Sequence, residues 1–157
     1  MVGSRAEHGG IIKDGAKMVN AVANSVVPKI TIIIGNSFGA GNYAMCGKAY
    51  DPRFIYAYPN AKIAVMGSAQ ASSVLLNIKI KQAEKSGKKV TEEKKQKLLD
   101  EITKAYDDKN NPYYAAARLW VDEIIDPAKT RKYVSMGIEV ANNNPDIPKF
   151  NTGVIQT

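Results

Sequence analysis

One stretch of the sequence combines residue types that could act on a substrate, the run Gly35-Asn36-Ser37-Phe38-Gly39. Its spacing fits the Gly-x-Ser-x-Gly pattern of a nucleophile elbow, in which a serine attacks an acyl carbon. A serine nucleophile needs a base to accept its proton, and the chain has one histidine, His8. His8 lies upstream in a polar, loop-like segment, whereas elbow hydrolases order the triad serine, acid, histidine. We therefore interpret Ser37 as a structural residue of the turn.

The glycines of the same stretch offer a second kind of chemistry, through backbone amides. Gly39, Ala40 and Gly41 follow an apolar run and precede a helical pattern. Such a turn exposes N–H groups at a helix N-terminus, where they suit an anion or a developing oxyanion. No Gly-Lys-Ser/Thr follows, and the spacing of a dinucleotide-binding fingerprint is absent. An ordinary glycine turn between a strand and a helix is the alternative interpretation.

Other chemistry-bearing residues have mostly structural interpretations. The single cysteine, Cys46, falls inside a helical pattern and is expected to pack in the interior. Asp122 and Glu123 are neighbours in an expected strand, so their side chains should point to opposite faces and not flank one substrate. Three aromatic residues are expected in the core or along a ligand groove, and two basic residues on a solvated helix face or at a partner chain: Tyr113, Tyr114, Trp120, Arg131 and Lys132.

Composition and charge exclude several classes of protein. The 157 residues carry 22 Lys and Arg against 15 Asp and Glu, a formal net charge of +7. Ten lysines and seven acids fall between Lys79 and Lys109, and aromatic residues do not alternate with them as they would on a surface that stacks bases. We interpret this segment as a solvated helical insertion and expect no nucleic-acid partner. No apolar run approaches the length of a membrane span, and one cysteine permits no internal disulfide.

Strand and helix patterns alternate along the chain and predict a single α/β domain. Apolar residues at helical spacing predict a helix over 10–26, which Pro28 ends. The β-branched run that follows predicts a buried strand, and a glycine-rich turn then leads to a short helix over about 41–48. Downstream, the patterns predict strands at 54–59 and 62–67 joined by a turn, a helix over 69–86, a mostly exposed helix from Thr91 to Lys104, a loop at 107–112, a helix over 111–119, a strand at 120–125 and a last helix capped by Asp126.

A resemblance to a known family rests on two long stretches, GIIKDGAKMVNAVANSVVPKITIIIGNSFGAGNYAMCGKAYDPRFIYAYPNAKIAVMG and NPYYAAARLWVDEIIDPAKTR. Together they resemble the carboxyltransferase β subunit of biotin-dependent acyl-CoA carboxylases, and GAGNYAMCGKAYDPRF is similar to the methylcrotonyl-CoA type. The resemblance implies a crotonase-like fold, an α/β spiral of ββα units. Residues 1–157 would form the C-terminal of two such domains, with the lysine-rich segment at about 79–109 as a helical insertion. In the family an apolar strand and an N-terminal domain precede Met1, so we expect a fragment truncated at its N-terminal strand.

The resemblance also implies a reaction and a set of site residues. The family transfers a carboxyl group from carboxybiotin to the α carbon of an acyl-CoA, with backbone amides stabilising oxyanions and biotin itself acting as the base. This chemistry explains the lack of a side-chain acid–base pair. Matched by position, the biotin-side amides belong to Ala40 and Gly41, and Ala69 stands where many relatives have Glu. The implied biotin-binding surface comprises Phe38, Gly39, Met66, Gly67, Gln70 and Ala71.

Cofactor, partners and location follow from the same resemblance. Biotin is expected on a separate carrier domain or subunit, and no metal is expected in this domain. Expected partners are the N-terminal carboxyltransferase domain, a second carboxyltransferase subunit, the biotin carboxylase and biotin carrier subunit, and acyl-CoA, in a homo-oligomer without nucleic acid or membrane. The expected location is the cytoplasm, or the mitochondrial matrix in a eukaryote. Two alternatives stay open: another crotonase-like acyl-CoA enzyme, and a noncatalytic assembly module.

Overall fold

The computed structural model describes residues 3–87 and 90–150. Within them, every strand pairing is parallel. Two strands, β2 (Asn36–Phe38) and β4 (Lys62–Ala64), form one sheet. The second sheet has three strands in the order β1-β3-β5, with bounds Ile30–Ile33, Phe54–Ala57 and Glu123–Ile124. Parallel strands joined by helices confirm the α/β class predicted from the sequence.

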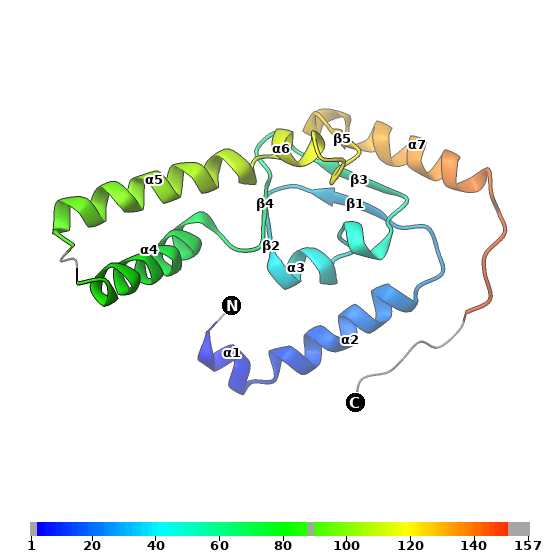
Figure 1. Ribbon diagram of the computed structural model, residues 1–157. Helices are drawn as coiled ribbons and strands as arrows, with labels where there is room; N and C mark the ends of the chain where they lie inside the picture. The colour runs from blue at the N-terminus through cyan, green and yellow to red at the C-terminus, as the bar shows by residue number, and fades with distance from the viewer. Residues whose placement is uncertain (1–2, 88–89, 151–157) are drawn as a thin grey trace.

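The chain repeats one unit of two strands and a helix. β1 and β2 lead into α3 (Gly39–Ala44), and β3 and β4 lead into α4 (Ser68–Lys85). The first strand of each unit joins the three-stranded sheet, and the second strand joins the two-stranded sheet. β3 and β4 are therefore not partners, although only a short turn separates them. The arrangement is the spiral of ββα units that the sequence resemblance implied (Figure 1).

The hydrophobic core lies on one face of the three-stranded sheet. Its side chains come from β1, β3, the turn between β3 and β4, and the segment around α6 (Pro112–Ala116). β-Branched and small residues predominate, because they pack well on a pleated, buried surface. The buried cluster comprises Ile33, Ile55, Ala57, Ala61, Ala115 and Val121.

α7 (Thr130–Asn142) covers the other face of this sheet. Gly137 brings the helix close, since a Cβ there would lie 2.7 Å from Ile30 Cδ1. The helix follows a 3₁₀ turn, Pro127–Lys129, which is capped by Asp126. The Asp126 carboxylate accepts a hydrogen bond of 3.0 Å from the backbone amide two residues further on. This cap and the proline after it confirm the helix start predicted from the sequence.

α4 and α5 (Glu92–Asn110) form a hairpin that projects away from both sheets (Figure 1). Lys94 and Lys97 are exposed and Lys95 is half-buried. On the apolar side of α5, Ile102 is buried. The lysine-rich segment therefore includes a mostly solvated helix with a narrow apolar stripe, as predicted.

α5 is longer than the sequence predicted, because the loop expected at 107–112 is helical up to Asn110. Asn110 is buried, and its side-chain amide donates a hydrogen bond of 3.2 Å to Asp107 on the preceding turn. Pro112 disfavours helical backbone at the residue before it, and Asn111 is extended and caps α6 with its side-chain oxygen. α5 therefore ends two residues before Pro112, and Asp107 and Asp108 lie within the helix and do not end it.

The first long helix, α2 (Ile11–Asn24), agrees with the helix predicted over 10–26. Three other predictions of local structure were wrong. His8 ends a short helix, α1, and does not lie in a loop, although it is exposed as expected. The expected glycine-rich turn is partly a strand, because β2 pairs with β4, and α3 begins at residue 39 instead of 41. The strand expected at 120–125 is confined to β5, because turns occupy residues 117–122.

The hydrogen bond between Thr103 and Ser72 is expected to stabilise the α4–α5 hairpin. Thr103 Oγ1 donates to Ser72 Oγ at 2.9 Å, and Ser72 is 1% exposed. Thr103→Val keeps the side-chain shape but removes a partner of the buried hydroxyl, so the free energy of unfolding should fall by about 1–3 kcal/mol. Adding Ser72→Ala should recover most of that loss, because no buried hydroxyl then lacks its partner. Urea denaturation followed by circular dichroism measures both effects, and strictly additive losses would contradict the coupling.

Candidate functional site

Two helices begin side by side at the carboxyl ends of the two-stranded sheet. β2 and β4 pair in parallel with Phe38 opposite Ala64, α3 starts at Gly39, and α4 starts at Ser68. Because both strands run in the same direction, both helix starts lie at the same edge of the sheet. The carboxyl edge of parallel strands is where α/β proteins commonly bind ligands. This edge holds the glycine turn selected from the sequence.

Gly39 allows the two segments to meet at this edge. Its φ of +53° lies in the left-handed region, and a Cβ there would stand 2.8 Å from the Val65 carbonyl oxygen. That contact is with backbone, which cannot move aside as a flexible side chain can. Both the dihedral angle and the close approach therefore require glycine at this position.

The next two residues expose their backbone to solvent. Ala40 and Gly41 occupy the second and third positions of α3, and both are exposed. N–H groups in the first turn of a helix have no carbonyl one turn earlier to bond. A Cβ at Gly41 would meet nothing within 4 Å, so a side chain at this position would enter open space. The turn therefore offers backbone donors of the kind that stabilise an oxyanion.

The second predicted segment, residues 66–71, lies next to this turn. A Cβ at Gly67 would stand 3.5 Å from the ring of Phe38, so the structure brings the two segments together. Ala71 is 3% exposed, and it therefore offers no side chain to an open surface. The exposed residues of this segment are Met66, Ala69 and Gln70.

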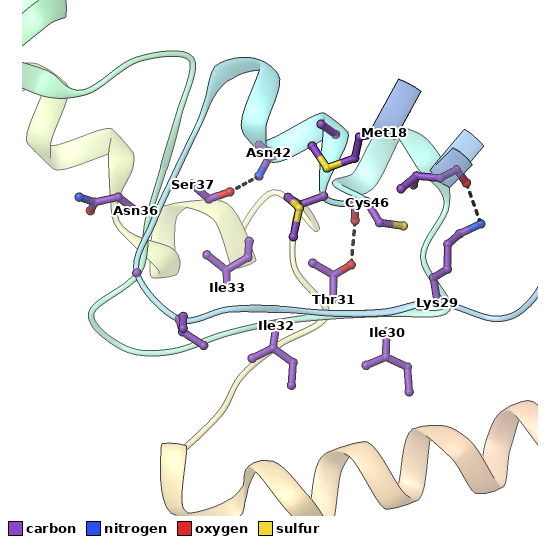
Figure 2. Close-up of a pocket in the computed structure, with 15 residues that line it drawn as sticks. Met18, Lys29, Ile30, Thr31, Ile32, Ile33, Asn36, Ser37, Asn42 and Cys46 are labelled. Atoms are coloured by element: carbon purple, nitrogen blue, oxygen red, sulfur yellow. Dashed lines mark hydrogen bonds between the residues drawn. The ribbon is translucent and has the colours of Figure 1, made fainter. Parts of the chain in front are cut away.

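A cavity of about 660 Å³ lies elsewhere, between β1, α2 and α3. Figure 2 shows Thr31 and Ile33 pointing from β1 toward α3, while Ile30 and Ile32 point the opposite way. The cavity includes Ser37 but none of the eight residues predicted for the site. Sequence reasoning missed it, and the only signal in the sequence was the apolar face of α2; the structure adds that none of the residues of this helix is buried.

The lining of this cavity is mostly aliphatic and does not suggest catalysis. Lys29 is its one charged residue. The Thr31 hydroxyl donates a hydrogen bond of 2.8 Å to the Cys46 carbonyl, which holds β1 against the end of α3 (Figure 2). Without an acid–base pair or a nucleophile beside a base, the cavity is an apolar surface and not a reaction centre.

Ser37 is held by a neighbour on α3. Its hydroxyl accepts a hydrogen bond of 2.8 Å from the Asn42 side-chain amide (Figure 2). No histidine lines the cavity into which Ser37 faces, and His8 is exposed on α1. The contact fastens β2 to α3, which agrees with a structural role for this serine.

Two of the aromatic candidates correct the sequence interpretation. Trp120 is 44% exposed and Tyr113 is 64% exposed, so neither belongs to the core. Tyr113 lies on α6, and Trp120 lies in the turns before β5, where the sequence had predicted a strand. Tyr114 packs under the guanidinium of Arg118, which lies 3.4 Å from its ring centroid. Cys46, by contrast, is buried as predicted.

The prediction for the basic residues Arg131 and Lys132 is confirmed, whereas the prediction for the acidic residues Asp122 and Glu123 was wrong. Arg131 and Lys132 are exposed, as predicted for a solvated helix face. Asp122 and Glu123 were expected to lie apart, but both line one cavity of about 230 Å³ beside α7. The alternation argument fails because Asp122 precedes β5 and is not part of the regular strand.

Comparison with known proteins decides the family. Residues 1–155 match the family described as the carboxyl transferase domain. The chain belongs to this family. It is 53% identical to the mitochondrial methylcrotonoyl-CoA carboxylase beta chain of Arabidopsis thaliana over 92% of its length. It is 49% identical to the biotin-dependent 3-methylcrotonyl-coenzyme A carboxylase beta1 subunit of Mycobacterium tuberculosis, again over 92% of its length.

Solved structures agree with this membership and with the crotonase-like fold. The whole chain superposes on the beta subunit of geranyl-CoA carboxylase from P. aeruginosa with a TM-score of 0.80 and 36% identity, covering 29% of that chain. It superposes on a transcarboxylase 12S structure, described as a hexamer assembly, with a TM-score of 0.79 and 33% identity, again covering 29% of that chain. The chain spans about a quarter of the length of the curated relatives it matches.

The part of the chain that the structure describes contains neither a cluster of metal-binding side chains nor a helix that could span a membrane. No group of three or more His, Cys, Asp and Glu side chains within residues 3–87 and 90–150 is placed to hold a metal ion. In the same ranges, no helix has both the length and the apolar character needed to cross a membrane.

Gly39 and Gly41 are expected to respond differently to alanine. Gly39→Ala forces a side chain into the left-handed region and against the Val65 carbonyl, so we expect a loss of about 1–3 kcal/mol in the free energy of unfolding. Gly41→Ala places its methyl group in open space and should leave the stability unchanged or slightly higher. Urea denaturation of both variants tests this difference, and equal losses would contradict the geometry of the turn.

Proposed function

We propose that this chain, residues 1–157, is the C-terminal domain of a carboxyltransferase subunit and forms the half of the active site that faces biotin. The observation that carries the proposal is the glycine-built start of α3. Ala40 and Gly41 are exposed, a side chain at Gly41 would enter open space, and this helix start lies at the same sheet edge as the start of α4. Under this proposal the lysine-rich segment at about 79–109 is a helical insertion outside the catalytic spiral.

The turn suits the ring carbonyl of biotin, which is flat and uncharged in the ground state. Gly41 has no side chain, and the space that a Cβ would enter is open. When bound, biotin supplies the carboxyl group that is transferred. The Ala40 and Gly41 N–H groups donate to an oxygen that gains negative charge, and one such donor is typically worth about 3–4 kcal/mol of the barrier.

The neighbouring segment 66–71 is proposed to bind and orient the same group. Met66 and Gln70 are exposed, and Gly67 lies close to the Phe38 ring, since a Cβ at Gly67 would stand 3.5 Å from it. Ala69 carries no ionisable group, so this surface provides no acid or base. The role left for the chain's own residues is to hold the ring, exclude water and stabilise charge through the backbone.

The other half of the site is proposed to come from an N-terminal carboxyltransferase domain of a second subunit, which would bind the acyl-CoA. Methylcrotonyl-CoA is the proposed substrate, because the two curated relatives described above are named for it. We propose a homo-oligomer that works with a biotin carboxylase and biotin carrier subunit, and the hexameric transcarboxylase neighbour supports the oligomer. The proposed location is the cytoplasm, or the mitochondrial matrix in a eukaryote, as the Arabidopsis relative is named mitochondrial.

Gly41→Val in the full-length subunit tests the amide turn. The added side chain meets open space in this domain, so the fold should survive while the room for the ligand is lost. The variant keeps its backbone N–H, but the valine side chain would keep the oxyanion from reaching it, so we expect carboxyl transfer to fall by a factor of about 100–1000, the usual cost of an oxyanion donor. Ser37→Ala is the matched control on the preceding strand and should remain nearly as active as the parent. Steady-state assays of both variants decide, and equal losses would restore Ser37 as a catalytic candidate.

The 157-residue chain alone is expected to show no carboxyl transfer. It would lack the acyl-CoA oxyanion donors, worth a factor of about 100–1000, and the positioning of the thioester, worth up to roughly 7–11 kcal/mol. The assay uses carboxybiotin with methylcrotonyl-, propionyl- or acetyl-CoA, first with the chain alone and then with the N-terminal domain added in trans. Activity that appears only on mixing supports the proposal. Turnover by the chain alone would overturn the division of the site.

A further inference from the structure

The cavity between α7 and the three-stranded sheet is separate from the glycine turn and shares no residue with it. Its volume is about 230 Å³. One wall comes from β3 and β5, and the other comes from successive turns of α7. Among its lining residues there are two carboxylates and three aromatic rings but no lysine or arginine. The lining comprises Phe54, Tyr56, Asp122, Glu123, Tyr133, Met136, Gly137 and Val140.

Aromatic rings form a continuous surface inside this cavity. Phe54 and Tyr56 are stacked, with centroids 5.7 Å apart and planes within 8° of parallel. Tyr133 meets Tyr56 edge-on at 5.4 Å. The faces of such rings carry a negative quadrupole and attract cations that approach them. A surface of this kind is suited to a positively charged group.

The two carboxylates have different tasks. Asp122 stabilises the fold. Its Oδ2 accepts a hydrogen bond of 2.7 Å from Ile55 N, and its Oδ1 lies 3.5 Å from Lys48 Nζ. Glu123 accepts one hydrogen bond, 2.5 Å from the Tyr133 hydroxyl, and has no ion-pair partner among the described residues. Because a carboxylate can accept several hydrogen bonds, Glu123 has acceptor capacity left for a ligand.

The carboxylates act electrostatically on the neighbouring tyrosines, Tyr56 and Tyr133, whose pKa values are both raised. Burial raises the pKa of Tyr56, and the carboxylates of Glu123 and Asp122 raise it further. The hydrogen bond to Glu123 is the main reason why the pKa of Tyr133 is raised. A cation beside the Tyr133 ring would therefore meet a favourable field, chiefly from Glu123, because Asp122 already pairs with Lys48.

We propose that this cavity binds a lysine or arginine side chain of a partner protein. Glu123 would pair with the charged head, and the Tyr133 ring would lie against it, while Tyr56, which is 4% exposed, supports that ring from within the core. Met136 and Val140 are exposed by 44% and 46%, and they would contact the aliphatic stem of the same side chain. Arginine should bind more tightly than lysine, because its planar guanidinium both stacks on rings and donates two parallel hydrogen bonds to a carboxylate.

The test is a titration of the isotopically labelled 157-residue chain with the peptide Ac-Gly-Arg-Gly-NH₂, followed by NMR chemical shifts. Shifts should concentrate on β3, β5 and the Tyr133–Val140 side of α7. The counterpart with citrulline has almost the same shape without the charge and should bind at least about fivefold more weakly. The lysine peptide should bind with intermediate affinity. Equal binding of the citrulline peptide, or shifts elsewhere on the chain, would overturn the proposal.

Variants locate the charge that the peptide recognises. Glu123→Gln removes the charge at constant shape and should weaken the arginine peptide about fivefold or more. Glu139→Gln is the matched control, since Glu139 is exposed on α7 and does not line the cavity. Tyr133→Leu removes a ring and leaves the carboxylate, and it should weaken binding as well. Amide spectra of each variant verify the fold, and unchanged affinity in folded Glu123→Gln would overturn the proposal.

Discussion

The approach of Gly39 to the Val65 carbonyl is the contact on which the rest of the candidate site depends. A side chain at Gly39 would collide with that carbonyl, and the left-handed φ would strain any residue with a Cβ. Because the contact is possible, β2 and β4 can lie in register until their last residues, and α3 can begin at once. One missing Cβ thus fixes both the end of a strand and the direction of a helix.

A site built in this way relies on backbone groups for its chemistry. The amides of Ala40 and Gly41 are held by the helix geometry, and neither needs a particular side chain to donate. Such donors are already oriented before the reaction, so little free energy is needed to reorient them as charge develops. This explains how a chain with one exposed histidine and no acid–base pair in the turn can belong to a family of enzymes.

Neighbouring residues of one strand end show how the same chemistry can serve two purposes. The Asp122 carboxylate replaces a backbone acceptor for Ile55 N and so extends the pairing between β3 and the segment before β5. Glu123, one residue later, is the first residue of β5, and its side-chain carboxylate accepts a hydrogen bond from the Tyr133 hydroxyl on α7. The first carboxylate holds the sheet together, and the second shapes a cavity between the sheet and a helix. Only their surroundings distinguish them.

The sequence by itself determined the α/β class, the helices expected over 10–26 and 69–86, and the glycine-rich stretch, because these depend on local periodicity, on β-branched runs and on positions that only glycine tolerates. It indicated the family through the resemblance of two long stretches. It did not determine that β2 is a strand, since three residues form one only when β4 lies beside them. Nor did it reveal that Asp122 and Glu123 share a cavity, or that Trp120 is exposed. Those features depend on contacts between segments distant in the chain, and local patterns carry no information about such contacts. Tertiary structure alone decided them.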